Sequence, residues 1–237
     1  MRIPHGIFDY KIEIGGAPAP SYPTDGLCYR WSFDSSLTAD PVSISPAIWT
    51  PYGTVDFSTN KIEGVGSMWG HSGKVRCGDA SVYNLLKGTN SWSIVIWYNR
   101  LSSTGWFYGA GDLNNQSPYP RTLAYFSGTA CYTEMKRDTS KKTLTLSKTL
   151  SANTYYMYVL RYQGGAGWWA HVWPDASGYV AHNEAQTSSV FNGLSLMGPV
   201  FNTTEQNTQN CVDVMYLYNK SLSEAEMAQL WNNGAGV

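Results

Sequence analysis

The segment from residue 211 to residue 236 constrains the fold more than any other, because a strand pattern runs straight into a short helix with both ends marked. Val212, Val214, Tyr216 and Tyr218 occupy alternate positions, and alternate side chains of a strand share one face. The positions between them are also largely apolar. The pattern therefore predicts a strand with one face fully buried and the other partly covered.

A short helix is predicted directly after this strand. Ser223 lies three residues before Glu226, the spacing of a capping box, in which the serine hydroxyl accepts a hydrogen bond from the third helical residue. Leu222 and Met227 match the hydrophobic staple that fixes the entry angle of the chain. Gly234 stands where a left-handed C-cap is expected, which limits the helix to about two to three turns.

Further strand patterns fill most of the chain. Residues 91–98 give the strongest one: Trp92, Ile94 and Ile96 face one way, while Val95 and Trp97 face the other, so both faces should be covered. Other strands are expected at residues 27–33, 123–132, 143–150, 155–162 and 168–173, and residues 194–197 should open the last strand pair.

These patterns resemble a known family. The sequences Tyr218-Asn219-Lys220, Leu222-Ser223 with Glu226, and Leu230 to Gly234 are similar to the end of a laminin-G-like domain of the concanavalin A-like lectin/glucanase superfamily. Trp231 stands where that family usually has tyrosine. Residues 26–34 and 91–98 resemble two earlier strands of the family, and the resemblance covers about residues 25–236 in order. It implies an all-β fold, a two-sheet antiparallel jelly-roll sandwich with a short C-terminal helix.

Length and composition fit one such domain. The 237 residues favour a single sandwich, residues 25–237, preceded by a Pro- and Gly-rich arm, residues 1–24. A net charge of −1 and the lack of a basic stripe argue against nucleic acid as a partner. No apolar run is long enough to insert into a membrane, and the N-terminus lacks the pattern of a signal peptide.

The four cysteines, Cys28, Cys77, Cys131 and Cys211, are widely spaced, without the paired spacing of a zinc or redox motif. The family resemblance implies that the strands of Cys28 and Cys211 lie side by side, so a bridge between them stays open. Buried free thiols are the favoured interpretation.

Catalysis is not predicted. Retaining glucanases of the superfamily carry carboxylates at alternate positions of one strand, and this chain has no such pattern. Its closest carboxylate pair, Glu224 and Glu226, falls in the first turn of the predicted helix, where the helix dipole stabilises negative charge.

Binding is the favoured alternative. Sugar rings stack on exposed aromatic side chains, so the candidates are aromatics expected in loops: Trp49, Tyr52, Trp69, Tyr119 and Trp168. The same side chains could instead cover hydrophobic loops or anchor a protein interface, where Trp and Tyr are enriched.

No cofactor is predicted apart from Ca²⁺, a ligand that the family resemblance implies. Asp112 and Asn114 lie in the one loop with a high density of oxygen donors, which Ca²⁺ prefers. An ordinary Asx-turn explains the same residues and is favoured.

The sequence therefore predicts a non-catalytic, lectin-like surface module. Without a secretion signal, we expect it on a phage or viral particle, as a capsid decoration, fibre or tail-associated protein that contacts glycans or neighbouring virion proteins. The alternatives are a secreted bacterial adhesin or lectin domain, which would be extracellular, and a glycoside hydrolase. Homo-oligomerisation stays open.

Overall fold

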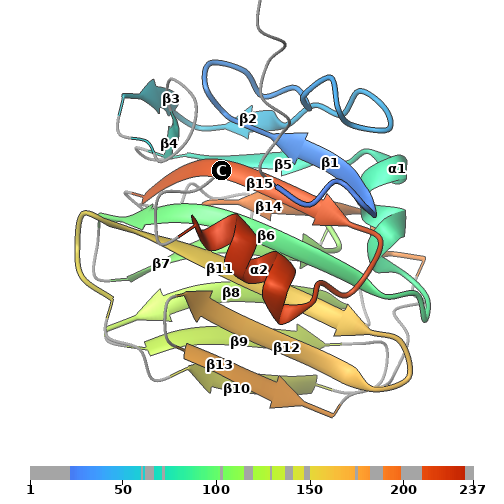
Figure 1. The fold of residues 1–237 in the computed structure, drawn as a ribbon. Helices are drawn as coiled ribbons and strands as arrows, with labels where there is room; N and C mark the ends of the chain where they lie inside the picture. The colour runs from blue at the N-terminus through green and yellow to red at the C-terminus, as the bar shows by residue number, and fades with distance from the viewer. Residues whose placement is uncertain are drawn as a thin grey trace, which may run out of the picture.

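A computed structural model shows two antiparallel sheets and one short C-terminal helix, which confirms the predicted two-sheet sandwich (Figure 1). The structure describes residues 22–59, 61, 67–70, 73–101, 104–114, 120–128, 130–136, 141–146, 150–173, 176–181, 189–198 and 210–232. Within these ranges no helix is long and apolar enough to cross a membrane.

The front sheet is the one that carries helix α2 in Figure 1. Its strands run in the order β13-β12-β11-β6-β15-β4-β3, and β1 also pairs with β15. Their bounds are β13 Ala176–Val180, β12 Gly167–Trp173, β11 Thr154–Gln163, β6 Trp92–Arg100, β15 Asn210–Tyr218, β4 Ser67–Gly70, β3 Val55–Ser58 and β1 Leu27–Trp31.

The back sheet lies behind it in the same view, in the order β10-β9-β8-β7-β14-β5-β2. Its bounds are β10 Lys141–Leu146, β9 Ala130–Lys136, β8 Arg121–Ser127, β7 Thr104–Gly111, β14 Gly193–Leu196, β5 Lys74–Cys77 and β2 Thr50–Tyr52. The helical segments are α1 Ala80–Tyr83, the 3-10 turn η1 Asn84–Leu86 and α2 Glu224–Trp231.

Two hydrophobic clusters hold the layers together. The larger one fills the space between the sheets and takes Trp92, Ile94 and Ile96 from β6. The smaller one lies on the outer face of the front sheet, under α2, and takes Val95 and Trp97 from the same strand. Both faces of β6 are thus covered, as the alternation predicts.

The final strand departs from its predicted alternation. Val212 and Met215 belong to the inner cluster, whereas Val214 and Tyr216 belong to the outer one. The cause is a β-bulge, because the register with β6 shifts between Val212 and Met215. One extra residue on the bulged strand moves the side chains beyond it to the opposite face. Both faces of this strand are buried, whereas partial cover was predicted for one.

Two predictions of strand organisation were wrong. Residues 123–132 form a hairpin, β8 and β9, whose turn contains Gly128 with a φ of 60°, a conformation that glycine adopts without strain. Strand β14, which was expected to open the last pair, lies in the back sheet between β7 and β5, while β15 lies in the front sheet.

Helix α2 has the predicted start but ends earlier. The Ser223 hydroxyl accepts from the Glu226 amide, and the Glu226 side chain accepts from the Ser223 amide, so the capping box is confirmed. Leu222 and Met227 are both buried in the outer cluster, as a staple requires. The left-handed C-cap is Asn232 (φ 42°, ψ 48°), whose amide donates to the Ala228 carbonyl, and Gly234 lies outside the described residues.

The cysteines are all buried and free, which confirms the favoured interpretation. Strands β1 and β15 do pair, but β1 lies opposite residues 215–218 of β15. Cys211 lies further along β15, opposite Trp69 and Asn99. The register therefore places Cys28 and Cys211 toward opposite ends of the strand pair.

Candidate functional site

The structure separates the predicted aromatic candidates. Trp49 and Trp168 are core side chains, 1% and 0% exposed, so the prediction that they face a ligand was wrong. Tyr52 is 41% exposed, with the Arg76 guanidinium 4.7 Å from its ring centroid. Trp69 is half-buried on β4, and Tyr119 lies outside the described residues.

The sequence prediction named Trp168, one position before the tryptophan that faces outward. Strand β12 begins at Gly167, so Trp168 points into the inner cluster and the next residue, Trp169, points out. The outward positions of β12 are Trp169, His171 and Trp173, an alternation already visible in the sequence of that strand. Assigning the other set of alternate residues in 168–173 to the outer face would have found Trp169, but its neighbours Arg161 and Tyr179 follow only from the strand pairing.

The outward row of β12 continues onto both neighbouring strands. Arg161 of β11 lies directly opposite Trp169, and Trp169 lies directly opposite Tyr179 of β13. The Trp169 and Tyr179 ring centroids are 4.6 Å apart, and the Arg161 guanidinium lies 4.9 Å from the Trp169 ring. Cross-strand contacts of this kind stabilise a sheet face and fix the ring positions.

The end of this row at β13 is open to solvent. Tyr179 is 47% exposed, and β13 is the edge strand of the front sheet among the described strands. Its hydroxyl donates to the Ala166 carbonyl at 2.7 Å, which fixes the orientation of the ring. A half-exposed ring that is held in place offers stacking area at little entropic cost.

Polar groups adjoin the rings on the side of α2. Arg161 donates to the Leu222 carbonyl (2.8 Å), to the Glu224 carboxylate (2.7 Å) and from Nε to His171 Nε2 (3.2 Å). Burial, together with the Arg161 charge, lowers the pKa of His171 to about 4, so its imidazole is neutral at physiological pH and can accept that bond. Glu224 is the exposed member, with its side chain 66% accessible.

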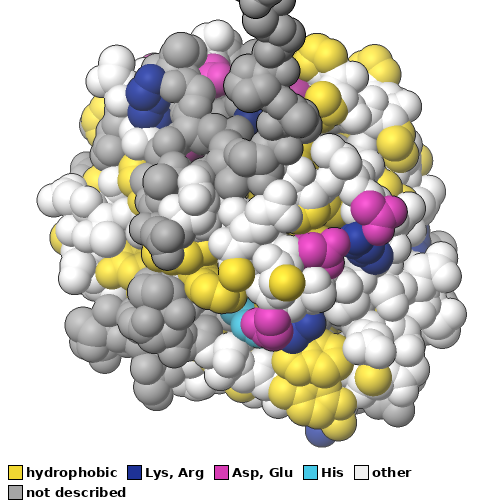
Figure 2. Space-filling view, viewed as in Figure 1, with side chains coloured by type: hydrophobic (Ala, Val, Ile, Leu, Met, Phe, Trp, Pro, Cys, Tyr) yellow, Lys and Arg dark blue, Asp and Glu magenta, His cyan; other side chains and the backbone are white. Residues whose placement is uncertain are grey.

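We call Arg161, Trp169, His171, Tyr179 and Glu224 the β12 surface. Figure 2 shows hydrophobic, basic, acidic and histidine side chains together on this face, below the position of α2 in Figure 1. The arrangement combines aromatic area with charged hydrogen-bonding groups, which is the chemistry that a sugar ring and its hydroxyls require.

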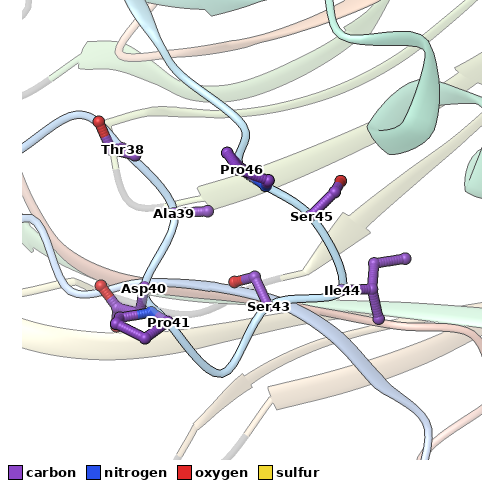
Figure 3. Close-up of a pocket in the computed structure, with 8 residues that line it drawn as sticks. All are labelled: Thr38, Ala39, Asp40, Pro41, Ser43, Ile44, Ser45 and Pro46. Atoms are coloured by element: carbon purple, nitrogen blue, oxygen red, sulfur yellow. The ribbon is translucent and has the colours of Figure 1, made fainter.

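A depression of about 300 Å³ lies elsewhere, in the loop between β1 and β2 (Figure 3). Its lining is Thr38, Ala39, Asp40, Pro41, Ser43, Ile44, Ser45 and Pro46. Asp40 is engaged within the fold, by an ion pair with Arg30 and a bond from the Ser32 hydroxyl. Because no aromatic ring lines it, this depression is the weaker candidate for a sugar.

The predicted calcium loop contains an Asx-turn, since Asp112 Oδ1 accepts from the Asn114 amide at 2.9 Å. Asp112 is 2% exposed, and Asn114 is exposed. Within the described part of the chain, no group of three or more His, Cys, Asp or Glu side chains is placed to hold a metal ion. Calcium binding at Asp112 and Asn114 stays a prediction.

The chain folds as a two-sheet antiparallel β-sandwich, and solved structures share that fold. The binding domain of botulinum neurotoxin DC in complex with SialylT matches with a TM-score of 0.67 at 13% identity, covering 89% of this chain and 52% of that one. A structure of botulinum neurotoxin type C matches with a TM-score of 0.65 at 13% identity, covering 89% of this chain and 51% of that one. Cell entry of that toxin is described as dependent upon interaction with two ganglioside molecules.

The binding domain of botulinum neurotoxin DC in complex with rat synaptotagmin II matches with a TM-score of 0.66 at 13% identity, covering 89% and 52%. This chain thus spans about half the length of these toxin domains. No family model matches the sequence. No curated protein matches it either. The two-sheet β-sandwich is confirmed, and membership of the laminin-G-like family stays a prediction.

Proposed function

We propose that this chain is a non-catalytic recognition module that binds glycans on the β12 surface. The observation that carries the proposal is the row Arg161–Trp169–Tyr179, in which an exposed ring is fixed beside a charged cluster. A sugar would stack on the open side of Tyr179 and receive hydrogen bonds from the polar groups next to Trp169.

The structural neighbours support this proposal at a coarser level. Two of them are described with a sialylated or ganglioside ligand and one with a protein receptor. Because fold alone does not fix function, the argument depends on the surface of this chain. A protein partner on the same surface is the alternative outcome of the test.

The test is a glycan array probed with the wild-type chain, with Trp169→Ala, and with Phe57→Ala as a matched control. Phe57 is 42% exposed on β3, at the other end of the front sheet, so its loss removes a comparable ring from an unrelated place. We expect specific binding that falls at least tenfold in Trp169→Ala and persists in Phe57→Ala.

Equal loss in both variants, or no binding to any glycan by the wild type, would contradict the proposal. Repeating the array with a chelator tests the calcium prediction separately. Loss of binding under chelator would make Asp112 and Asn114 candidate ligands of a required ion. Unchanged binding would show that glycan binding does not require calcium.

The place where the module works is a separate proposal. We propose that the module works on the surface of a phage or viral particle, with a secreted adhesin as the alternative. Mass spectrometry of purified particles from the source would detect the chain if the first is correct. Its absence from particles would favour the second.

A further inference from the structure

A second row of aromatic rings lies on the back sheet. Trp106 of β7 is directly opposite Tyr125 of β8, which is directly opposite Tyr132 of β9. All three side chains are half-buried, whereas their chain neighbours Phe126 and Cys131 belong to the inner core. The three rings therefore point outward, on the face of the molecule opposite the β12 surface. We call them the back ladder.

The rings of the back ladder cover one another. The centroids of Tyr125 and Tyr132 are 5.1 Å apart at 13°, and those of Trp106 and Tyr125 are 4.5 Å apart at 44°. Because each ring covers a face of its neighbour, few ring faces are left for bases to stack on, in contrast to proteins that bind single-stranded nucleic acid. What the row offers to solvent is the outer edges of its rings and the phenolic hydroxyls of the two tyrosines, which can exchange hydrogen bonds with the hydroxyls of a sugar.

Charged side chains follow on the same face, on β8, on β9 and on the next strand of the sheet, β10. Glu134, two residues beyond Tyr132, pairs with Arg121 (Nε to Oε1, 2.5 Å) and with Lys141 (Nζ to Oε2, 2.6 Å). Burial favours the neutral form of Glu134, but the bonds from Lys141 and Arg121 outweigh it and hold its pKa below the ordinary value. The Lys141 side chain is 49% exposed, and an ammonium has more donors than one carboxylate oxygen takes up.

The register adds a third cation to this group. Arg121 lies opposite Lys136, and Lys136 lies opposite Lys141, so three cations form one row across three neighbouring strands. Like charges directly opposite one another destabilise a sheet. With Glu134 as the carboxylate among them, these four side chains carry a net positive charge, which complements an anion. The row lies about 13 Å along β8 from the back ladder at about 3.3 Å per residue, further than one sugar ring reaches.

From this juxtaposition we propose that the outer face of the back sheet binds an acidic oligosaccharide. The back ladder contacts the sugar rings, and Arg121 and Lys141 contact a carboxylate or sulfate group. This site is independent of the β12 surface and faces the other way, so one molecule would hold two glycan chains at once.

The test measures binding of the full chain to sodium hyaluronate, a polysaccharide with one uronate carboxylate in each disaccharide, with dextran as the neutral comparison. The variants are Lys141→Gln and Tyr125→Phe, and Lys87→Gln is the matched charge control. Lys87 is a half-buried lysine that packs on Tyr83, away from this face. We expect the Kd for hyaluronate to rise about tenfold in Lys141→Gln, as for loss of one charge-assisted bond, and to stay unchanged in Lys87→Gln.

Tyr125→Phe keeps the ring and removes only the hydroxyl, so it should weaken binding severalfold without unfolding the sheet. Trp169→Ala should leave hyaluronate binding unchanged, which separates this site from the β12 surface. Three results would overturn the proposal: no hyaluronate binding, equal loss in Lys87→Gln, or equal affinity for single-stranded DNA or phosphatidylserine vesicles.

Discussion

Arg161 is the residue on which the geometry of the β12 surface depends. Its guanidinium joins β11 to the segment that leads into α2 through the Leu222 carbonyl, to α2 through Glu224, and to β12 through His171 and Trp169. The three hydrogen bonds use N–H groups at the edge of the planar guanidinium, and Trp169 contacts the group through its ring. A lysine keeps the charge but cannot reproduce that fork.

Arg161→Lys should therefore lower the free energy of unfolding by about 1–3 kcal/mol, through lost bonds to buried acceptors. Glu224→Gln removes only the exposed ion pair and should cost less than about 1 kcal/mol. Urea unfolding of both variants measures the difference. Equal effects would mean that the ion pair, and not the whole set of contacts, gives Arg161 its role.

His171 makes stability depend on pH. Its pKa is lowered from 6.5 to about 4 in the folded chain, so the unfolded chain takes up a proton first as the pH falls. The contribution is fully present above about pH 6.5 and is lost progressively as the pH falls toward 4, by up to about 3 kcal/mol. His171→Gln, which keeps an acceptor for Arg161, should show a flatter stability profile over this range in urea unfolding. Parallel profiles would contradict the assignment.

The buried thiols should be inert in the folded chain. Burial raises the pKa of Cys77 and Cys211 to about 11 and that of Cys131 to about 12, so almost no thiolate exists at pH 8. Treatment with Ellman's reagent at that pH should label little in the native state and all four cysteines after unfolding in guanidinium. Rapid labelling of the native chain would show that one of these strands opens.

At the scale of elements, α2 depends on its cap and on the outer cluster. Met227 and Leu230 are buried against the front sheet, and Trp231 stacks on Trp97 with centroids 5.1 Å apart at 4°. The cap bonds the Ser223 hydroxyl to the Glu226 amide at 3.3 Å. The helix therefore holds Glu224 over Arg161 only while its first turn is formed.

Ser223→Ala should lower the free energy of unfolding by about 1 kcal/mol, the usual cost of an N-cap. Ser177→Ala, an exposed serine on β13, should change it by less than about 0.5 kcal/mol. Thermal unfolding followed by circular dichroism compares the two variants. Equal shifts would show that the cap contributes nothing beyond a surface serine.

The elements also show what local sequence can and cannot predict. The capping box and the two-sided strand β6 were predictable, because both depend on residues within a few positions of one another. The bulge in β15 was not, because it exists only relative to β6. The two aromatic rows were not predicted either, because each depends on the register between neighbouring strands. That register is set by pairing among β11, β12 and β13 for the β12 surface, and among β7, β8 and β9 for the back ladder.

At the scale of the whole molecule, the sandwich offers two outer faces with different coverings. The front face carries α2 and a second hydrophobic cluster, and the β12 surface lies beside them on β11, β12 and β13. The back face carries the back ladder and the cation row without a described helix over them. The separation of the two faces by the inner core is what makes their ligands independent.

The boundary between the arm and the domain gives the last prediction. Residues 1–21 lie outside the described residues, and contacts with the sandwich are described from Tyr22 onward. The Tyr22 ring lies 5.5 Å from that of Tyr216, and the Pro23 carbonyl accepts from the Tyr218 hydroxyl at 3.1 Å. These contacts cover the end of the outer cluster, where loss of a half-buried ring is costly.

Deletion of residues 1–21 should therefore leave Tm within about 1 °C of the wild type, whereas deletion of residues 1–25 should lower it by several degrees, at about 2–4 °C for each kcal/mol lost. Differential scanning calorimetry of the two truncations makes the comparison. If the shorter deletion already lowers Tm as much as the longer one, the domain begins before residue 22, and the arm predicted from the Pro- and Gly-rich sequence is part of the folded unit.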